Sequence, residues 1–370
     1  MKKILHVVGR MHYGGMETLI MNLYRHIDKE KIQFDILAYY AKPGEYDEEV
    51  RQLGGNVYVV ERTLNPIKYL YKLGVFFSKH HDYAAVHVHI LWLAWIYFLY
   101  ADKYGIKKLS HIHSDKILHK GIFLAIWRMF EKISIKKSDT IFACSKKAAL
   151  YHGSDKKKTY LLKNGIDGKR FYYNESVRKE VRAEFRLEQK KVVVCTARFT
   201  TPKNHKFLIN IIDEMVKRDK SVFLLLIGEG PLEAFIRQTV EKLGLVSYVK
   251  FMGVRNDVNR ILQGADAYVM PSLYEGLGIA YIEAQSAGMK TFASDEAYKE
   301  EAHISDLFLH RPLTDGAQVW AEWILQNIVY ERISKQEELL KSGFEIDKTA
   351  YLLQYFYMGE ANATELFELI

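Results

Sequence analysis

The sequence predicts an α/β protein made of two Rossmann-like, doubly wound parallel-sheet domains that face each other across a cleft. Short apolar runs alternate with helical patterns, which is typical of parallel sheets with helices on both faces. The chain has 370 residues, more than one ordinary core accommodates. A second series of apolar runs begins near Val192, and residues 165–187 are the predicted joining segment and hinge.

Each half supplies its own buried strands and amphipathic helices. The N-terminal domain, residues 1–170, has strands predicted at 4–8, 34–38, 57–60, 85–89, 108–112, 140–143 and 160–162, with helices at 16–26 and 122–135. The C-terminal domain, residues 171–345, has strands predicted at 192–197, 222–227, 249–252, 267–270 and 290–293, with helices at 207–218 and 232–243. The apolar run 90–101 is shorter than the ~20 residues of a membrane-spanning helix, so it is interpreted as a buried helix.

Composition and charge limit the kinds of partner that the chain can have. The residues are 49% hydrophobic and 26% charged, ordinary values for a folded globular protein. The formal net charge of +8 favours anionic partners without saying which. Cys144 and Cys195 cannot form a disulfide framework and are interpreted as buried small hydrophobes in a reducing compartment. Because the apolar N-terminal stretch is too short for a signal peptide, a cytoplasmic protein is expected.

Glycines follow the first predicted strand at Gly9, Gly14 and Gly15. A glycine-rich turn that enters a helix offers backbone N–H groups to an anion, although a plain tight turn has the same composition. The spacing matches neither the dinucleotide fingerprint nor a Walker A loop. Gly228 and Gly230, after a later strand, predict a close backbone approach to a ligand or to a neighbouring loop.

Two cations, Arg198 and Lys203, follow the first strand of the second domain. Ligands of open α/β sheets lie outside the carboxyl ends of the strands, so this position favours a ligand contact. A planar guanidinium and a point-charge ammonium can together clamp a diphosphate. A solvated loop is the alternative.

Two acids, Glu275 and Glu283, follow the strand 267–270. Between them, residues 276–278 lead into a helix whose first amides suit phosphate or sugar oxygens. If both acids were helical, they would lie roughly on one face, about two turns apart. One acid could then meet a sugar and the other the hydroxyls of a ribose. The alternative is an N-terminal helix carboxylate and an incidental surface glutamate.

Together these motifs resemble glycosyltransferase family 4 over nearly the whole chain. Their order and spacing carry the resemblance, and the residues are Gly14-Gly15-Met16-Glu17, Ala143-Cys144-Ser145-Lys146, Leu162-Lys163-Asn164-Gly165-Ile166-Asp167, Phe171, Arg198, Lys203-Asn204, Gly228-Glu229-Gly230-Pro231, Phe251-Met252-Gly253, Asp257, Glu275 and Glu283. Segments 17–25 and 31–35 are similar to the exopolysaccharide and capsule branch of that family.

The resemblance implies a GT-B fold in which a C-terminal helix, about residues 346–370, returns to the N-terminal domain. It implies a retaining, metal-independent transfer of a hexose-type sugar from a nucleotide diphosphate donor, with a UDP-sugar favoured. The acceptor would be a saccharide or lipid-linked saccharide, part of a growing cell-surface glycan. The leaving diphosphate would help to deprotonate the acceptor, so neither a cofactor nor a side-chain nucleophile is required.

The resemblance also assigns roles to single residues. Arg198 and Lys203 would hold the donor diphosphate, Glu275 would contact the donor sugar, and Glu283 would bind the ribose. The implied donor-binding set is Gly14, Gly15, Arg198, Lys203, Glu275, Gly276, Leu277, Gly278 and Glu283, and the implied catalytic set is Glu275, His113, Arg198 and Lys203. The sequence departs from the family at Gly278, where Pro or Phe is frequent, and at Lys290, where Pro is usual. Both departures bear on donor identity and local rigidity.

Two His-x-His pairs, His87/His89 and His111/His113, have strand spacing, so each pair lies on one face of its strand. Four histidines suggest zinc, but no carboxylate or thiolate falls at ligand spacing nearby, and Asp-x-Asp is absent. No metal is therefore expected. In the resembling enzymes, a histidine after the fourth or fifth N-terminal strand lines the acceptor side, and His113 is the best match. A satisfied strand-end histidine is the alternative.

Residues 116–137 and 68–81 place aromatic and apolar side chains among lysines at helical spacing. Basic amphipathic segments suit an anionic membrane surface, which would make the protein peripheral on the inner face of the cell membrane. Two ordinary helices with solvated lysines are the alternative.

Other functions compete with glycosyl transfer. An epimerase would need paired acids near the sugar, and a phosphorylase would need a cofactor lysine, for which there is no distinctive candidate. A non-catalytic protein that binds sugar nucleotides or a glycan is disfavoured by the intact residues Arg198, Lys203, Glu275 and Glu283. Nucleic acid is not an expected partner, because no binding motif accompanies the positive charge.

Overall fold

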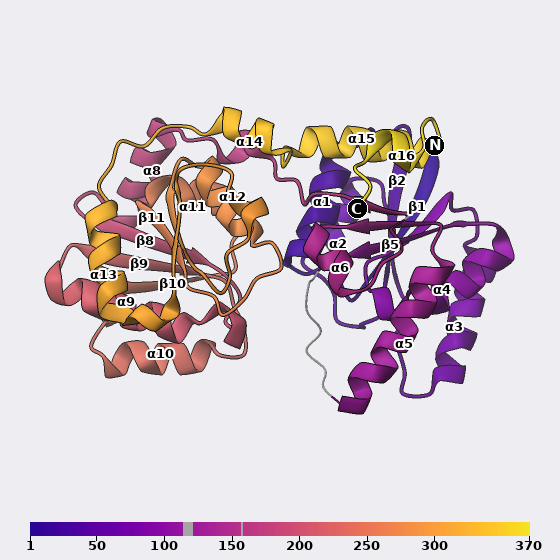
Figure 1. The fold of residues 1–370 in the computed structure, drawn as a ribbon, viewed down its shortest axis with the longest axis horizontal. Coiled ribbons are helices and arrows are strands. Elements are labelled where there is room, and N and C mark those ends of the chain that lie inside the picture. Colours follow the sequence, from indigo (N-terminus) through magenta and orange to yellow (C-terminus); the bar gives the residue numbers. More distant parts are fainter. Residues whose placement is uncertain (114–120, 157) are drawn as a thin grey trace. The chain divides into compact units, whose positions relative to one another are not determined.

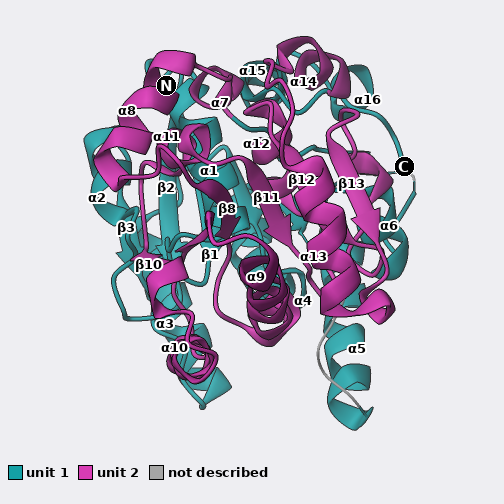
Figure 2. Cartoon of the chain, turned by 90° about the vertical axis from the view of Figure 1, so that its left-hand side faces the viewer, with its two compact units in different colours: residues 1–166, 343–370 teal, residues 167–342 magenta. Residues whose placement is uncertain are grey.

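The computed structural model describes residues 1–113, 121–156 and 158–370, and the chain divides into two compact units. Unit 1 comprises Met1–Ile166 and Gly343–Ile370, and unit 2 comprises Asp167–Ser342 (Figures 1 and 2). The C-terminal segment is therefore part of the N-terminal unit.

Unit 1 contains a seven-stranded parallel sheet in the order β3-β2-β1-β4-β5-β6-β7. The strands are β1 (Lys2–Val8), β2 (Ile32–Ala38), β3 (Val57–Val59), β4 (Ala85–Val88), β5 (Lys107–Ile112), β6 (Thr140–Ala143) and β7 (Thr159–Leu161). The helices are α1 (Gly15–His26), α2 (Asp47–Gln52), α3 (Pro66–Lys79), α4 (Leu91–Tyr104), α5 (Gly121–Lys137), α6 (Lys146–Tyr151), α15 (Ile346–Met358) and α16 (Ala363–Leu366).

Alternation along β1 separates the two helical layers of unit 1. Ile4 and Val8 pack in the core cluster formed with α1 and α15, whereas Leu5 and Val7 pack in the cluster formed with α3 and α4. Helix α4 contains the predicted apolar helix and buries one side of it, including Tyr97. Among the described residues, no helix has both the length and the apolar character needed to cross a membrane.

Unit 2 contains a six-stranded parallel sheet in the order β10-β9-β8-β11-β12-β13. The strands are β8 (Lys191–Thr196), β9 (Val222–Ile227), β10 (Val249–Gly253), β11 (Ala267–Met270), β12 (Lys290–Ser294) and β13 (Phe308–Arg311). The helices are α7 (Gly168–Phe171), α8 (Glu175–Phe185), α9 (His205–Arg218), α10 (Glu233–Lys242), α11 (Val258–Gly264), α12 (Ile279–Ser286), α13 (Gly316–Asn327) and α14 (Gln336–Ser342), with short 3-10 turns η1 (Thr201–Lys203), η2 (Val246–Tyr248), η3 (Glu300–Ala302) and η4 (Leu313–Asp315).

The predicted α/β class with two parallel sheets is confirmed, and so is the position of each predicted strand. Strand β13 is an addition that the sequence did not predict. It lies at the edge of the sheet, and only Phe308 of its residues is fully buried, so it lacks a continuous apolar run. Both cysteines are buried, as the sequence interpretation expects.

The condition that Glu275 and Glu283 are both helical is not met, because α12 begins only at Ile279, after Gly278 has adopted a left-handed φ of 76°. Most of the predicted hinge is also folded into unit 2. Helix α8 is anchored there by Arg178 and Arg182, which both bind the carboxylate of Asp266.

Candidate functional site

Two loops that carry predicted site residues follow β8 and β11, which are neighbours in the unit 2 sheet. The strand order reverses between these two strands, and ligands of open α/β sheets bind at such a point. The loops are tied together, since the amide of Leu273 donates to the Pro202 carbonyl at 2.7 Å. The side-chain amide of Asn204 also donates to the Pro271 carbonyl at 3.1 Å. The loop after β8 is therefore fixed against the loop after β11.

Lys203 and Glu275 meet where the two loops join. Lys203 Nζ lies 2.7 Å from Oε1 and 2.7 Å from Oε2 of Glu275. The hydroxyl of Ser272 donates to Oε1 at 2.6 Å. The Glu275 side chain is only 7% exposed, and a carboxylate at that depth needs such partners. Sequence reasoning missed Ser272, although its position three residues before Glu275 in a loop was a signal for this contact.

Arg198 is exposed, and within the described residues its guanidinium makes no hydrogen bond or ion pair. The backbone around it is held by the glycines after β9. A Cβ on Gly228 would lie 2.3 Å from the carbonyl oxygen of Ala197, and one on Gly230 would lie 2.6 Å from that of Phe199. The predicted close backbone approach is thus confirmed, with the neighbouring loop as the partner. Arg198 projects from a rigid backbone and can bind an anion.

The amides of Gly276, Leu277 and Gly278 precede α12 and donate to no acceptor in the described part of the chain. The turn depends on glycine at position 278, because a Cβ there would lie 2.4 Å from Cδ2 of Tyr281. This contact and the left-handed φ of 76° together explain why the turn needs glycine at this position. Free amides at the start of a helix are suited to phosphate or sugar oxygens.

Glu283 lies on α12, partly exposed, and its carboxylate has no hydrogen bond or ion pair with any described residue. Burial raises the pKa of Glu283 to about 7, and the charge of Arg170 opposes that shift. An unpaired carboxylate in this setting has its full capacity to accept hydrogen bonds from hydroxyl groups.

Lys290, where the family resemblance leads one to expect proline, makes a backbone hydrogen bond. The backbone N–H of Lys290 donates to the hydroxyl of Tyr330 at 2.8 Å. That hydroxyl in turn donates to the carbonyl of Gly288 at 3.2 Å. A proline at position 290 has no N–H and would lose the first bond.

In unit 1, Gly14 and Gly15 stand at the start of α1, after β1. The nearby carboxylate of Glu17 is buried and forms an ion pair with His12 at 3.1 Å. The hydrogen bond to Glu17 raises the pKa of His12. A Cβ on Gly14 would lie 2.5 Å from Oε2 of Glu17, whereas one on Gly15 would meet nothing within 4 Å. The turn therefore holds an acid of its own beside the amides that were expected to bind an anion.

His113 follows β5, and its ring belongs to a cluster of histidines on the α15 side of the unit 1 sheet. Each predicted His-x-His pair does share a face. Sequence reasoning missed His6, whose place between Ile4 and Val8 on β1 puts it on that same face. The members of the cluster are His6, His87, His89, His111 and His113.

Two subsets of these histidines bring their ring nitrogens within 4.8 Å of one another, namely His6/His87/His89 and His89/His111/His113. Imidazoles are common metal ligands, but the contacts here are short and paired. His6 Nδ1 lies 2.9 Å from His89 Nε2, and His89 Nδ1 lies 2.8 Å from His113 Nε2. Zinc would hold its nitrogen ligands about 3.3 Å apart around one centre. Over the described ranges, no carboxylate or thiolate joins either subset to balance a cation.

Comparison with known proteins gives a consistent result for both units. Residues 13–170 match the model of Glycosyltransferase Family 4, and residues 177–308 match that of Glycosyl transferases group 1. The putative glycosyltransferase EpsF of Bacillus subtilis is 29% identical, over 96% of this chain and 96% of that protein. The capsular polysaccharide biosynthesis glycosyltransferase CapH of Staphylococcus aureus is 23% identical, over 97% and 99%.

The fold is shared with a solved structure from Anabaena, HepE in complex with UDP and glucose. It superposes with a TM-score of 0.73 at 16% identity, covering 97% of this chain and 98% of that one. The two parallel-sheet units thus have the GT-B fold. The two family models together span most of both units, and the chain is a glycosyltransferase in which a Glycosyltransferase Family 4 region is followed by a Glycosyl transferases group 1 region.

Proposed function

We propose that this glycosyltransferase transfers a hexose-type sugar from a UDP-sugar to a growing, lipid-linked cell-surface glycan, with retention of the anomeric configuration. The observation that carries the proposal is the grouping after β8 and β11. It consists of Arg198 and the amides that precede α12, none of which has a partner in the part of the chain that the structure describes, and of the Lys203–Glu275 pair.

The donor diphosphate is bound by Arg198 and Lys203, with further hydrogen bonds from the amides of residues 276–278. Glu283 binds the ribose hydroxyls through its unpaired carboxylate. The complex of HepE with UDP and glucose supports the choice of a UDP-sugar, since that protein shares the fold.

Chemistry at the sugar needs no metal and no side-chain nucleophile. Lys203 and Arg198 offset the charge that develops on the leaving diphosphate, and fixed cations of this kind lower the barrier to transfer. Glu275 contacts the donor sugar, and the leaving diphosphate takes the proton of the acceptor hydroxyl. His113 forms a hydrogen bond with the reacting sugars on the acceptor side.

The relatives support the proposed acceptor. CapH is by its name a capsular polysaccharide biosynthesis glycosyltransferase, and it matches this chain over nearly its whole length. The amide of Gly15 binds a sugar or phosphate oxygen beside α1, whereas the amide of Gly14 already donates to the His12 carbonyl at 2.8 Å.

The protein reaches a lipid-linked acceptor by docking on the anionic inner face of the cell membrane. Helix α5 exposes Ile122, Phe123, Ile126 and Met129, and its last turn carries Lys136 and Lys137. Helix α3 exposes further apolar side chains at Ile67, Tyr71 and Val75 among lysines. Apolar side chains beside cations are suited to an anionic lipid surface. The remaining residues of the predicted basic segment, 116–120, lie outside the described ranges.

A screen of sugar nucleotides tests the proposal. The melting temperature of the full chain is measured with UDP-, GDP- and ADP-sugars, since a ligand that binds the folded state stabilises it by mass action. UDP-sugars are expected to raise it most, and the product formed with a lipid-linked acceptor should keep the donor's anomeric configuration by NMR. An inverted product, an epimerised sugar nucleotide, or donor binding without transfer would each reject the proposed reaction.

A further inference from the structure

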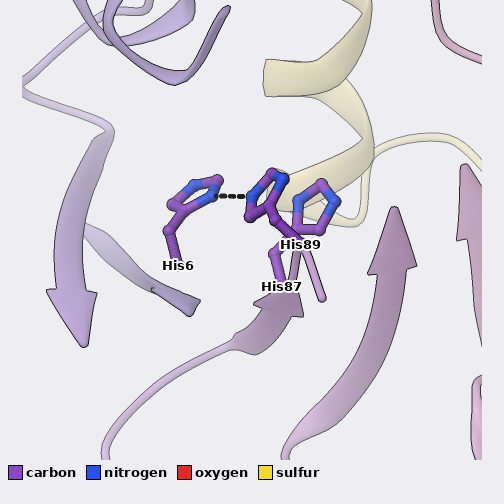
Figure 3. A group of neighbouring side chains, drawn as sticks. All are labelled: His6, His87 and His89. Carbon is purple, nitrogen blue, oxygen red and sulfur yellow. Dashed lines mark hydrogen bonds between the residues drawn. The ribbon is translucent and has the colours of Figure 1, made fainter. Parts of the chain in front are cut away.

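Three histidines of unit 1 form a linear hydrogen-bonded chain, which we call the histidine relay. His6 on β1 meets His89 through Nδ1 and Nε2 at 2.9 Å (Figure 3). His89 meets His113 through Nδ1 and Nε2 at 2.8 Å. The planes of the His6 and His89 rings differ by only 22°. Both nitrogens of His89 are therefore occupied, one by each neighbour.

The two ends of the relay differ in their surroundings. His6 is fully buried, and its ring lies against Phe34 with 4.2 Å between the ring centroids. His6 Nε2 has no hydrogen-bond partner among the described residues. His113, at the other end, follows β5 at the carboxyl edge of the sheet, and its Nδ1 likewise has no partner there. The inner end is thus buried beside Phe34, His87 and Tyr357, while the outer end, although its Nδ1 is also buried, lies at the edge of the sheet where ligands of such folds bind.

We propose that His6 and His89 are positioning residues that hold the His113 ring neutral, with Nε2 occupied and only Nδ1 left without a hydrogen-bond partner among the described residues. The substrate contact of His113 rests on the proposed function, whereas the state of its ring does not. His113 would then act as a neutral hydrogen-bonding group toward a sugar hydroxyl or phosphate oxygen. It would not act as a general base.

The path that a proton would take along the relay explains why His113 would not act as a general base. If His113 Nδ1 took a proton from an acceptor hydroxyl, the Nε2 proton could pass to His89 Nδ1, and the Nε2 proton of His89 could pass to His6 Nδ1. The net result is a charged and fully buried His6 ring, because His6 Nε2 has no hydrogen-bond partner among the described residues to take the proton. An uncompensated buried charge is strongly unfavourable. The only titratable groups in ring contact with the relay are His87, His111 and Tyr357, within the residues described.

Desolvation of the three rings also disfavours their protonated forms. Burial lowers the pKa of His6 and of His113 to about 3, and it lowers the pKa of His89 well below its ordinary value. A protonated relay is therefore disfavoured at every position. The acceptor's proton must go elsewhere, which agrees with its transfer to the leaving diphosphate.

Histidine ¹⁵N spectra of the full-length chain test the relay without any substrate. Between pH 5 and 8, the two ring nitrogens of His113 should keep the pattern of a neutral ring, whereas an ordinary histidine would titrate near pH 6.5. The variant His6→Leu removes the inner partner and should shift the His113 signals, although His6 is not hydrogen-bonded to His113. His6→Asn places an amide near the former Nδ1 and should keep the His113 signals close to those of the parent.

A matched control is His111→Phe, since both ring nitrogens of His111 lack partners among the described residues. It removes a buried imidazole beside the relay and should leave the tautomer of His113 unchanged. Titration of His113 near pH 6.5, an unchanged His113 spectrum in His6→Leu, or one metal ion per chain on these nitrogens would each overturn the relay. If His6→Leu fails to fold, the titration of the parent protein and the spectrum of His6→Asn still decide whether the relay holds His113 neutral.

Kinetics provide a second readout once transfer is measured. His6→Leu should lower kcat about 10–100-fold with little change in the donor KM, as expected when a reacting partner is misplaced. His6→Asn should recover most of that loss. Absent transfer in the parent chain would reject the proposed function and leave the spectroscopic result on the relay intact.

Discussion

Lys203 binds both carboxylate oxygens of Glu275, each at 2.7 Å, and so joins the loop after β8 to the loop after β11. The two side chains thus neutralise each other in the structure. If Lys203 binds the diphosphate and Glu275 the sugar, as we propose, donor binding shares Lys203 between a phosphate and Glu275 and couples the two recognition steps.

Replacing either partner should abolish most of the transfer activity. We expect Lys203→Ala and Glu275→Ala each to lower kcat by about 10²–10³, because each removes a charge placed for the transition state. Both variants should remain folded, with a loss of about 1–3 kcal/mol in unfolding free energy from the unpaired partner. Circular dichroism and turnover measure the two effects. The control is Lys206→Ala, an exposed lysine nearby on α9. Full turnover in both site variants would reject the assignment.

Gly278→Ala should destabilise unit 2 and weaken nucleotide binding. Its left-handed φ of 76° strains any other residue, and the new Cβ would also lie 2.4 Å from the ring of Tyr281. Gly244→Ala is the matched control, because Gly244 has a φ of 69° but no neighbour within 4 Å. Denaturant unfolding should show a loss of about 1–2 kcal/mol for the control from backbone strain, and more for Gly278→Ala. Equal losses would mean that contact with Tyr281 is unimportant.

Glu283 should make stability depend on pH between about 4.5 and about 7. Its raised pKa means that the folded chain binds a proton in this window that the unfolded chain has released, so stability falls as pH rises. The full effect is at most on the order of 3 kcal/mol. Glu283→Gln should flatten this slope in unfolding measured at pH 5, 6, 7 and 8, while Glu241→Gln on the exposed side of α10 should not. A parent-like slope in Glu283→Gln would contradict the raised pKa.

Removal of divalent metal should leave transfer intact, because Arg198 and Lys203 supply the positive charge at the diphosphate. The rate is measured after dialysis against a chelator, with the metal content of the chain determined in parallel. Activity that disappears and returns on addition of manganese would show that a metal takes part.

Exposed apolar residues of α5 should contribute to membrane binding. Phe123 is 71% exposed, and burying such a side chain in lipid is worth about 1.5–3 kcal/mol. Phe123→Ser should therefore weaken binding to vesicles that contain phosphatidylglycerol by about tenfold or more. Val329→Ser, at a residue of unit 2 that is 74% exposed, is the control. Equal binding by all three proteins, or equal binding to neutral phosphatidylcholine vesicles, would contradict the docking surface.

The predictions that succeeded from sequence were those set by local periodicity. Continuous apolar runs identified the strands, because parallel strands are buried on both faces. Period-two spacing put His87 with His89 and His111 with His113 on shared faces. Strand β13 was not predicted because an edge strand needs no continuous apolar run. Whether Glu275 is helical stayed open because the conformation of Gly278 cannot be read from its neighbours.

The sequence by itself determined the two parallel sheets and the position of Arg198, Lys203 and Glu275 after the strands that carry them, since these follow from residue order and burial pattern. Only the tertiary structure decided that Lys203 pairs with Glu275, that Glu283 has no partner among the described residues, and that His6 completes a chain with His89 and His113. The pair Lys203–Glu275 and the chain of His6, His89 and His113 join residues that are far apart along the sequence. They depend on which strands become neighbours, and sheet order is fixed by packing of the whole unit rather than by any local pattern.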